Sequence, residues 1–272
     1  MEIPFAKVQG NGNDFIIIDE YRHNVIPDDM KGQFALNYCD RRFGIGADGV
    51  IYLSKSEKSD IRMRIFQPDA SEAEMCGNGI RCLAKYAFDA GYVKGTCTVE
   101  TPAGPLAVTM AYRDDEFSAT ITMTPPRFDR SEIPATGTGE YKEHIGIFDV
   151  YAVNTGVPHA VIPVDSVDSI DIATIAPPIR SHQSFPQGAN VNFMEKSGEN
   201  SIRIRTFERG VEDETLSCGT GATASAAIAH KLGLVGETVS VETLGGPLTI
   251  YLKDEVKMEG PAVTVFGGVI LF

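Results

Sequence analysis

Two cysteines, Cys76 and Cys218, stand in the same short motif, Cys-Gly-x-Gly, 142 residues apart. A thiol that begins a helix meets unpaired backbone N–H groups and the positive end of the helix dipole, which lower its pKa. The same N–H groups can bind a carboxylate, and the glycines let a ligand approach the backbone. Two such thiols on opposite sides of a carbon atom could take a proton from one face and deliver one to the other. The pair therefore predicts acid–base chemistry that inverts a stereocentre.

The motif belongs to a longer internal repeat. The stretch EAEMCGNGIRCLAKYAFDAGYV, which contains Cys76, aligns without a gap with ETLSCGTGATASAAIAHKLGLV, which contains Cys218. The register continues into VETPAGPL and VETLGGPL. Upstream it extends to three further matches, which are Phe43 with Phe185, Gly46 with Gly188, and Ala47 with Ala189. We infer a duplicated domain.

Each repeat predicts the elements that must hold its cysteine. The segments IRMRIF, ending at Phe66, and IRIRTF, ending at Phe207, alternate apolar and polar residues as a strand with one wet face does. The Cys-Gly-x-Gly segment then opens a helix, and the one after Cys218 has so few polar residues that it should be buried. Gly91 and Gly233 stand where a helix C-terminal cap belongs. The VET and GPL segments predict two strands joined by a turn.

The predicted fold class is α+β, with two homologous domains that each wrap a β-sheet or barrel around a central helix. The first domain is expected to span residues 1–118, completed by the strand-like residues 264–272, and the second to span 119–263. A duplicated domain usually packs on itself about a pseudo-twofold axis. Corresponding sites, here the two cysteines, would then face each other.

The other three cysteines, Cys39, Cys82 and Cys97, are interpreted as small buried hydrophobes. A disulfide between Cys76 and Cys218 is a competing interpretation of the pair. The spacing of the five cysteines fits no zinc motif, so no metal is expected.

The formal net charge of −13 argues against a general nucleic-acid binder, because phosphate contacts need clustered Lys and Arg. No apolar run approaches the roughly 18 residues of a membrane helix, and the first residues lack the pattern of a secretory signal. An odd number of cysteines in such a chain favours reduced thiols in the cytoplasm. We therefore expect a cytoplasmic protein that acts on a small molecule, with neither a membrane nor nucleic acid as partner.

These motifs resemble those of the diaminopimelate epimerase family over essentially the whole chain. The matching blocks are GNGNDF at 10–15, RRFGIGADG at 41–49, SEAEMCGNGIRC at 71–82, GVPHAV at 156–161, GANVNF at 188–193 and FERGVEDETLSCGTGA at 207–222. The resemblance implies two similar domains with the active site between them. It also implies interconversion of LL- and meso-diaminopimelate, in lysine biosynthesis, without pyridoxal phosphate or a metal.

The resemblance further implies a role for each matched residue. Cys76 and Cys218 would be the acid/base residues. The reacting carboxylate would be held by Gly77, Asn78, Gly219 and Thr220. The rest of the substrate would contact Asn13, Gln67, Asn190, Glu208 and Arg209. His159 and Glu208 would tune the two cysteines.

Simpler interpretations exist for several of these residues. Asn13 stands in a Gly-rich turn, where Asn is common for backbone reasons. His159 could be a loop histidine, and Glu208 with Arg209 could be a surface ion pair of little energetic value. Asp14 and Asp48 are expected to fix loops.

Three departures from the family pattern concern the substrate. Many relatives carry Asn in place of Gln67, Gly in place of Ala70 and Asn in place of Val157. Gln67 and Val157 would lie where the distal end of the substrate is recognised. The alternative function is therefore a racemase of another amino acid on the same fold. A thiol-redox or amino-acid-binding protein without turnover is the alternative from another class. The sequence leaves the oligomeric state open, a homodimer included.

Overall fold

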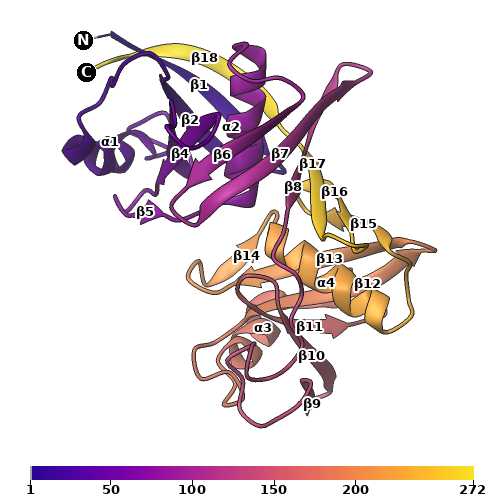
Figure 1. The fold of residues 1–272 in the computed structure, drawn as a ribbon. Helices are drawn as coiled ribbons and strands as arrows, with labels where there is room; N and C mark the ends of the chain where they lie inside the picture. The colour runs from indigo at the N-terminus through magenta and orange to yellow at the C-terminus, as the bar shows by residue number, and fades with distance from the viewer. Residues whose placement is uncertain (1) are drawn as a thin grey trace. The chain divides into compact units, whose positions relative to one another are not determined.

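The structure is a computed structural model that describes residues 2–272, and it divides into two compact units (Figure 1). Unit 1 comprises the chain up to Ile121 together with Glu259–Phe272, and unit 2 comprises Thr122–Met258. The repeat places these boundaries at 118/119 and 263/264 instead. In the structure the chain passes from one unit to the other at 121/122 and at 258/259. Both points lie inside continuous strands, so the end of the sequence repeat does not mark them.

Unit 1 is a sheet curved around the helix α2 (Figure 1). Its hydrogen-bonded strands run in the order β18, β1, β2, β3, β4, β6, β7 and β8, with β5 added beside β4. The elements are β1 (Glu2–Gly10), β2 (Asn13–Glu20), η1 (Asp28–Met30), α1 (Lys31–Tyr38), β3 (Gly49–Ser54), β4 (Ile61–Phe66), β5 (Glu72–Ala73), α2 (Gly77–Asp89), β6 (Thr96–Thr101), β7 (Gly104–Arg113), β8 (Glu116–Thr122), β17 (Lys257–Pro261) and β18 (Val263–Leu271).

Unit 2 repeats this arrangement around the helix α4. Its strands run in the order β9, β10, β11, β12, β13, β15 and β16, with β14 beside β13. The elements are β9 (Lys142–Ile145), β10 (Phe148–Asn154), β11 (Pro158–Pro163), η2 (Val167–Ser169), α3 (Ile172–Arg180), β12 (Asn190–Gly198), β13 (Ser201–Glu208), β14 (Asp213–Thr215), α4 (Gly219–Lys231), β15 (Thr238–Thr243) and β16 (Gly246–Tyr251).

The two units share one pattern of strand pairing, which confirms the predicted α+β fold with two homologous halves. Parallel β2–β3 corresponds to parallel β11–β12, and parallel β4–β6 to parallel β13–β15. The intervening pairs, β3–β4 and β12–β13, are antiparallel in both units. A parallel pair needs a crossover, and in each unit the central helix supplies one of them. The duplicated cysteine motif thus lies at the same point of the same crossover.

The central helix of unit 2 is buried, as its composition predicts. In α4 every residue from Gly221 to Ala229 is buried, because small side chains let the surrounding strands approach on all sides. Gly91 and Gly233 follow the two helices with φ of 74° and 70°, so both provide the expected left-handed cap.

One matched pair behaves differently in the two units. Phe185 is 3% exposed and stacks on Tyr141, with ring centroids 4.8 Å apart. Phe43 is 93% exposed, in the turn that follows α1. Sequence identity at these positions therefore does not reflect a shared core role.

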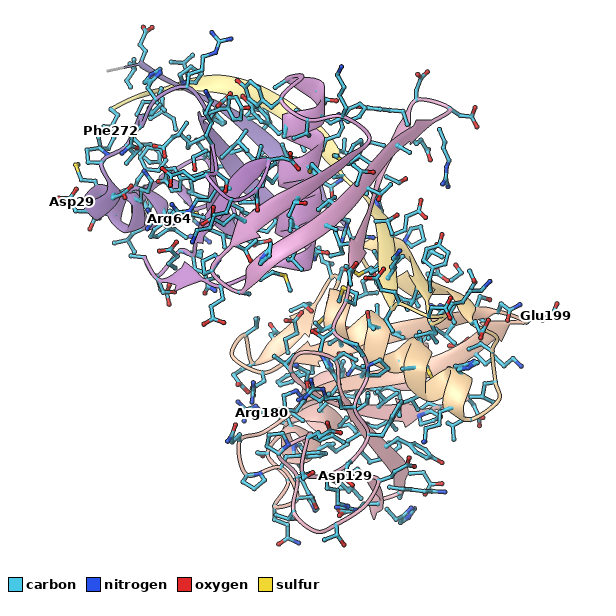
Figure 2. All side chains as sticks on the ribbon, in the orientation of Figure 1. Asp29, Arg64, Asp129, Arg180, Glu199 and Phe272 are labelled. Carbon is cyan, nitrogen blue, oxygen red and sulfur yellow. The ribbon has the colours of Figure 1, made fainter. Side chains whose placement is uncertain are left out.

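The last strand belongs to unit 1, where β18 pairs antiparallel with β1. Phe272 lies on the α1 side of this unit (Figure 2), with its ring 5.7 Å from that of Phe34. Among residues 2–272, no helix has the length and apolar character needed to cross a membrane.

Candidate functional site

Cys76 caps the N-terminus of α2. Its backbone is extended, with φ −143° and ψ 120°, and its Sγ accepts a hydrogen bond from the backbone N–H of Gly79 at 3.4 Å. Glycine at position 79 lets the helix pack closely, because a Cβ there would lie 3.3 Å from Ile51 Cδ1 and 3.4 Å from Ile65 Cδ1. The motif therefore places a half-buried thiol at the positive end of a buried helix.

Asn13 provides the second contact of the Cys76 thiol. Its Oδ1 lies 3.5 Å from Cys76 Sγ and 3.4 Å from Asn78 Nδ2. Its Nδ2 donates to Asp48 Oδ2 at 2.5 Å. Since a carboxylate can only accept, Asp48 sets the orientation of the Asn13 amide and turns its oxygen toward the cysteine. Asn13 is thus tied to the site by its side chain, not only by its turn.

Asp14 and Asp48 fix the surrounding loop, as expected. Arg41 donates to both carboxylates, and Lys7 pairs with Asp14 at 2.8 Å. Burial alone would raise the pKa of Asp14, but the hydrogen bonds from Arg41 and Lys7 lower that pKa to about 2. The two carboxylates and the two cations thus form one paired cluster, in which opposite charges face each other.

Arg81 lies in α2, one turn after the cysteine, and is fully buried. Its Nη2 donates to Asn78 Oδ1 at 2.9 Å and to Asn11 Oδ1 at 2.7 Å. Its Nη1 donates to Gly77 O at 3.2 Å, and its Nε to Pro261 O at 3.3 Å. The guanidinium holds Asn78 with its Nδ2 facing Asn13.

Cys218 caps α4 in the same way. Its φ is −120° and its ψ 110°, and its Sγ accepts from Gly221 N at 3.4 Å. Thr220 Oγ1 lies 3.4 Å from the sulfur. Burial, and then the negative charge of Glu208, raise the pKa of the Cys218 thiol to about 12. The hydrogen bonds at the helix start oppose this shift without cancelling it, so Cys218 is a thiol near neutral pH.

Glu208, at the end of β13, is a carboxylate that interacts with Cys218. Thr215 Oγ1 donates to its Oε1 at 2.5 Å, and burial raises the pKa of Glu208. It forms no ion pair with Arg209 among the described residues. The Arg209 guanidinium instead donates to the carbonyl oxygens of Gln187 and Gly188. The surface ion pair is therefore the wrong interpretation of these two residues.

His159 lies in the strand β11 and is fully buried, so the loop interpretation is wrong. Asn192 Nδ2 lies 3.0 Å from its Nδ1 and also donates to Ala160 O, so Nδ1 accepts and the ring proton lies on Nε2. That Nε2 is buried without a hydrogen-bond partner in the described structure. Burial, with a smaller contribution from Arg209, lowers the pKa of His159 to about 3, which keeps the ring neutral.

Three other residues expected at the site, Asn190, Gln67 and Val157, differ in their burial and contacts. Asn190, at the start of β12, accepts from Arg209 N at 2.8 Å and donates to Pro158 O at 3.3 Å. Gln67 is exposed in the turn after β4, and its backbone bonds to Ser71. Val157 precedes β11 and is half-buried.

Within unit 1 the structure thus gathers Cys76, Asn78 and Asn13, and within unit 2 it gathers Cys218, Thr220 and Glu208. Sequence reasoning missed the partners of these groups, which are the buried Arg81, Asn11 and Asn192 and the half-buried Thr215. One signal was available for Arg81. It is a charged residue beside Ile80 on a helix that the repeat predicts to be buried, and its match in the second half is Thr223.

The fold and the two cysteine-capped helices define a class of duplicated α+β proteins. Among solved structures, the chain is similar to a phenazine biosynthesis protein of Bacillus anthracis, with a TM-score of 0.75, 19% identity, and 100% of both chains covered. A probable proline racemase of Agrobacterium radiobacter gives a TM-score of 0.65 at 17% identity, covering 99% of this chain and 93% of the other. At these identities the likeness shows the shared fold.

Sequence comparison is more specific. The profile of the diaminopimelate epimerase family matches residues 5–128 and 151–265. The diaminopimelate epimerase of Methanothrix thermoacetophila is 55% identical, over 99% of this chain and 96% of its own length. That of Archaeoglobus fulgidus is 47% identical, over 99% and 97%. The chain belongs to the diaminopimelate epimerase family, and it is an isomerase of the racemase and epimerase class.

Proposed function

We propose that the protein interconverts LL- and meso-diaminopimelate by moving the α-proton between the thiols of Cys76 and Cys218. One observation carries this proposal: both halves of the chain place a thiol at the cap of a buried helix, in contact with the third backbone N–H after it. One sulfur, as thiolate, removes the proton from one face of Cα. The other, as thiol, delivers a proton to the opposite face, so the configuration inverts and the thiol and thiolate exchange places.

The backbone at the two helix starts has a further role in the proposal. Gly77, Asn78, Gly219 and Thr220 would donate to the substrate carboxylate, whose negative charge grows as the α-proton leaves. Helix N-termini stabilise such charge because their N–H groups are already oriented toward it. His159 and Glu208 would tune the chemistry. A neutral, buried imidazole with an unused Nε2–H offers a donor, and Glu208 holds Cys218 in its protonated form.

Substrate recognition beyond the reacting centre is assigned to Asn13, Gln67, Asn190, Glu208 and Arg209. Because the protein's own thiols carry the proton in this scheme, it needs neither pyridoxal phosphate nor a metal. The described residues contain no group of three or more His, Cys, Asp or Glu side chains arranged for a metal ion. The place we propose for the reaction is lysine biosynthesis in the cytoplasm.

A homodimer forms part of the proposal. Apolar side chains lie exposed along β18, among them Val269 at 57% and Leu271 at 79%. A second copy of the chain would cover them. Light scattering of the purified protein would give a mass near 59 kDa for a dimer, twice the 29.4 kDa of the chain, and a monomer mass would rule this out.

The deciding experiment incubates the reduced protein with LL-diaminopimelate in D₂O and follows α-deuterium by NMR. We expect deuterium at Cα together with meso product. Full activity in either Cys76→Ser or Cys218→Ser would refute the two-thiol mechanism.

The second candidate is a racemase of another amino acid. It is favoured by Val157, which cannot form a side-chain hydrogen bond, and by Gln67, which is exposed. Faster exchange with another amino acid in a substrate panel would select it. No exchange with any amino acid, in protein with free thiols, would point to a thiol-redox or binding protein.

A further inference from the structure

Arg81 is the largest of the fully buried side chains. A guanidinium keeps its charge in proteins, and burying a charge is costly unless hydrogen bonds and a counter-ion compensate it. Its four acceptors are the carbonyl oxygens of Gly77 and Pro261 and the amide oxygens of Asn11 and Asn78, which are all neutral. The guanidinium is thus hydrogen-bonded, and its charge is not balanced by any of these partners.

The charged groups around it leave this charge unopposed. Two carboxylates and two cations come from β1, β2 and the Arg41–Asp48 loop. They pair with one another, and they are Asp14, Asp48, Lys7 and Arg41. Glu259 of β17 is paired with Arg113 of β7 at 3.3 Å. Burial raises the pKa of the Cys39 and Cys82 thiols, so both stay neutral. After these groups, the ionisable group that still interacts with Arg81 is Cys76. Burial lowers the pKa of Arg81, and the interactions with Cys82 and Cys76 oppose that shift.

Arg81 also organises the amides around the cysteine. Its Nη2 holds Asn78 Oδ1, Asn78 Nδ2 then faces Asn13 Oδ1, and Asn13 Nδ2 faces Asp48. In this series of hydrogen bonds, each amide has only one orientation that gives every donor an acceptor. Loss of the guanidinium would free Asn78 to turn, so that its Nδ2 would no longer be held facing Asn13 Oδ1.

Unit 2 has no buried cation at the position that matches Arg81. Thr223 takes the place of Arg81 and donates to Gly219 O at 2.9 Å. Thr155 takes the place of Asn11. Phe15 and His159 are the first residues of the two matching parallel strand pairings, and Asn11 and Thr155 lie four residues before them. Thr155 Oγ1 donates to Thr220 O at 2.9 Å. A neutral pair of threonines therefore replaces a buried cation and its amide acceptor.

We infer that Arg81 is a positioning residue for Cys76: its buried charge favours the thiolate on Cys76, and its hydrogen bond fixes Asn78 as a donor toward the site. Cys218, whose surroundings favour its protonated form, has no such cation, because Thr223 stands in the matching place. The inference rests on the proposed function for its mechanistic meaning. The protonation of the two thiols, however, can be measured without any substrate.

The test is the rate of iodoacetamide alkylation of each cysteine against pH, in reduced protein, read by mass spectrometry of the peptides. Each cysteine is compared only with itself in another variant, because exposure differs between the two. In Arg81→Met we expect alkylation of Cys76 at pH 7 to slow at least about tenfold, and its pH profile to move to higher pH. The rate at Cys218 should stay within about twofold.

Two variants separate charge from packing. Arg81→Lys keeps the charge, so the Cys76 rate should stay within about threefold of the wild type. Thr223→Val removes the matching hydrogen bond of unit 2 and should leave Cys76 unchanged. A folded Arg81→Met protein with an unchanged Cys76 profile would overturn the inference. If Arg81→Met does not fold, a tenfold loss at Cys76 in folded Arg81→Lys would overturn it equally.

The outcome is independent of the deuterium experiment. Slower Cys76 alkylation in Arg81→Met with no diaminopimelate turnover in the wild type would support the inference and refute the proposed function. The reverse pattern would do the opposite.

Discussion

Arg81 and Thr223 occupy the same position of the two repeats, and each donates to the carbonyl oxygen of the glycine that follows the capping cysteine. The distances are 3.2 Å from Arg81 Nη1 to Gly77 O and 2.9 Å from Thr223 Oγ1 to Gly219 O. The duplication has therefore kept the hydrogen bond and changed the charge. The two thiols therefore have the same backbone surroundings and different electrostatic surroundings.

Replacing either capping cysteine should abolish epimerisation. In Cys76→Ser and Cys218→Ser, the loss of one acid/base group should lower the rate by at least about a thousandfold, because a serine hydroxyl is far harder to ionise than a thiol. The rate of meso-diaminopimelate formation measures this. Cys97→Val is the matched control, since Val239 stands at the same place in the second repeat and both are buried in their strands. Activity loss in the control would mean that the assay reports folding.

Glu208→Gln should make Cys218 more reactive and the enzyme less active. The carboxylate contributes to raising the pKa of Cys218, and a neutral amide of the same shape removes that charge. We expect alkylation of Cys218 at pH 8 to rise about tenfold, while the epimerisation rate falls because the substrate contact proposed for the Glu208 carboxylate is lost. Glu214→Gln is the control, because Glu214 is engaged by Arg205 at 2.6 Å. An equal effect of the two variants would remove the special role of Glu208.

Much of this architecture could be predicted from the sequence because the repeat carries it. The cysteine caps, the buried helices and the glycine caps are set by local motifs that occur twice. The environment of Arg81 could not be predicted, since its acceptors Asn11 and Pro261 lie 70 and 180 residues away in the chain. Helical periodicity alone would turn an arginine toward water. His159 was equally hidden, because the Pro158 before it suggests a loop while the parallel pairing with β12 buries it in a strand.

Ala70→Gly should stabilise unit 1. Ala70 has a φ of 70°, in the left-handed region, where an L residue with a Cβ pays roughly 1–2 kcal/mol. Glycine removes this strain but gains entropy in the unfolded chain, so we expect a net gain of about 0.5–1 kcal/mol in the free energy of unfolding. Urea titration with probes in unit 1 measures it. Ala87→Gly, in the buried middle of α2, should instead lose at least about 1 kcal/mol. A loss of stability in Ala70→Gly would show that the turn is not strained.

His159→Phe should remove part of the protein's acid sensitivity. In the folded state the pKa of His159 is lowered to about 3, whereas in the unfolded chain it returns to its ordinary 6.5. Its contribution to stability is therefore complete above pH 6.5 and is lost as the pH falls toward 3, because the unfolded state then binds the proton first. Between pH 7.5 and 5 the loss is about 2 kcal/mol. Phenylalanine is the natural choice, since Phe15 holds the matching place in unit 1. Urea unfolding at the two pH values should show a smaller difference for His159→Phe than for the wild type, by about that amount. His23→Phe, at an exposed position, serves as the control and should leave the difference unchanged. If His159→Phe and the wild type lose stability equally on acidification, the imidazole is not held neutral by burial.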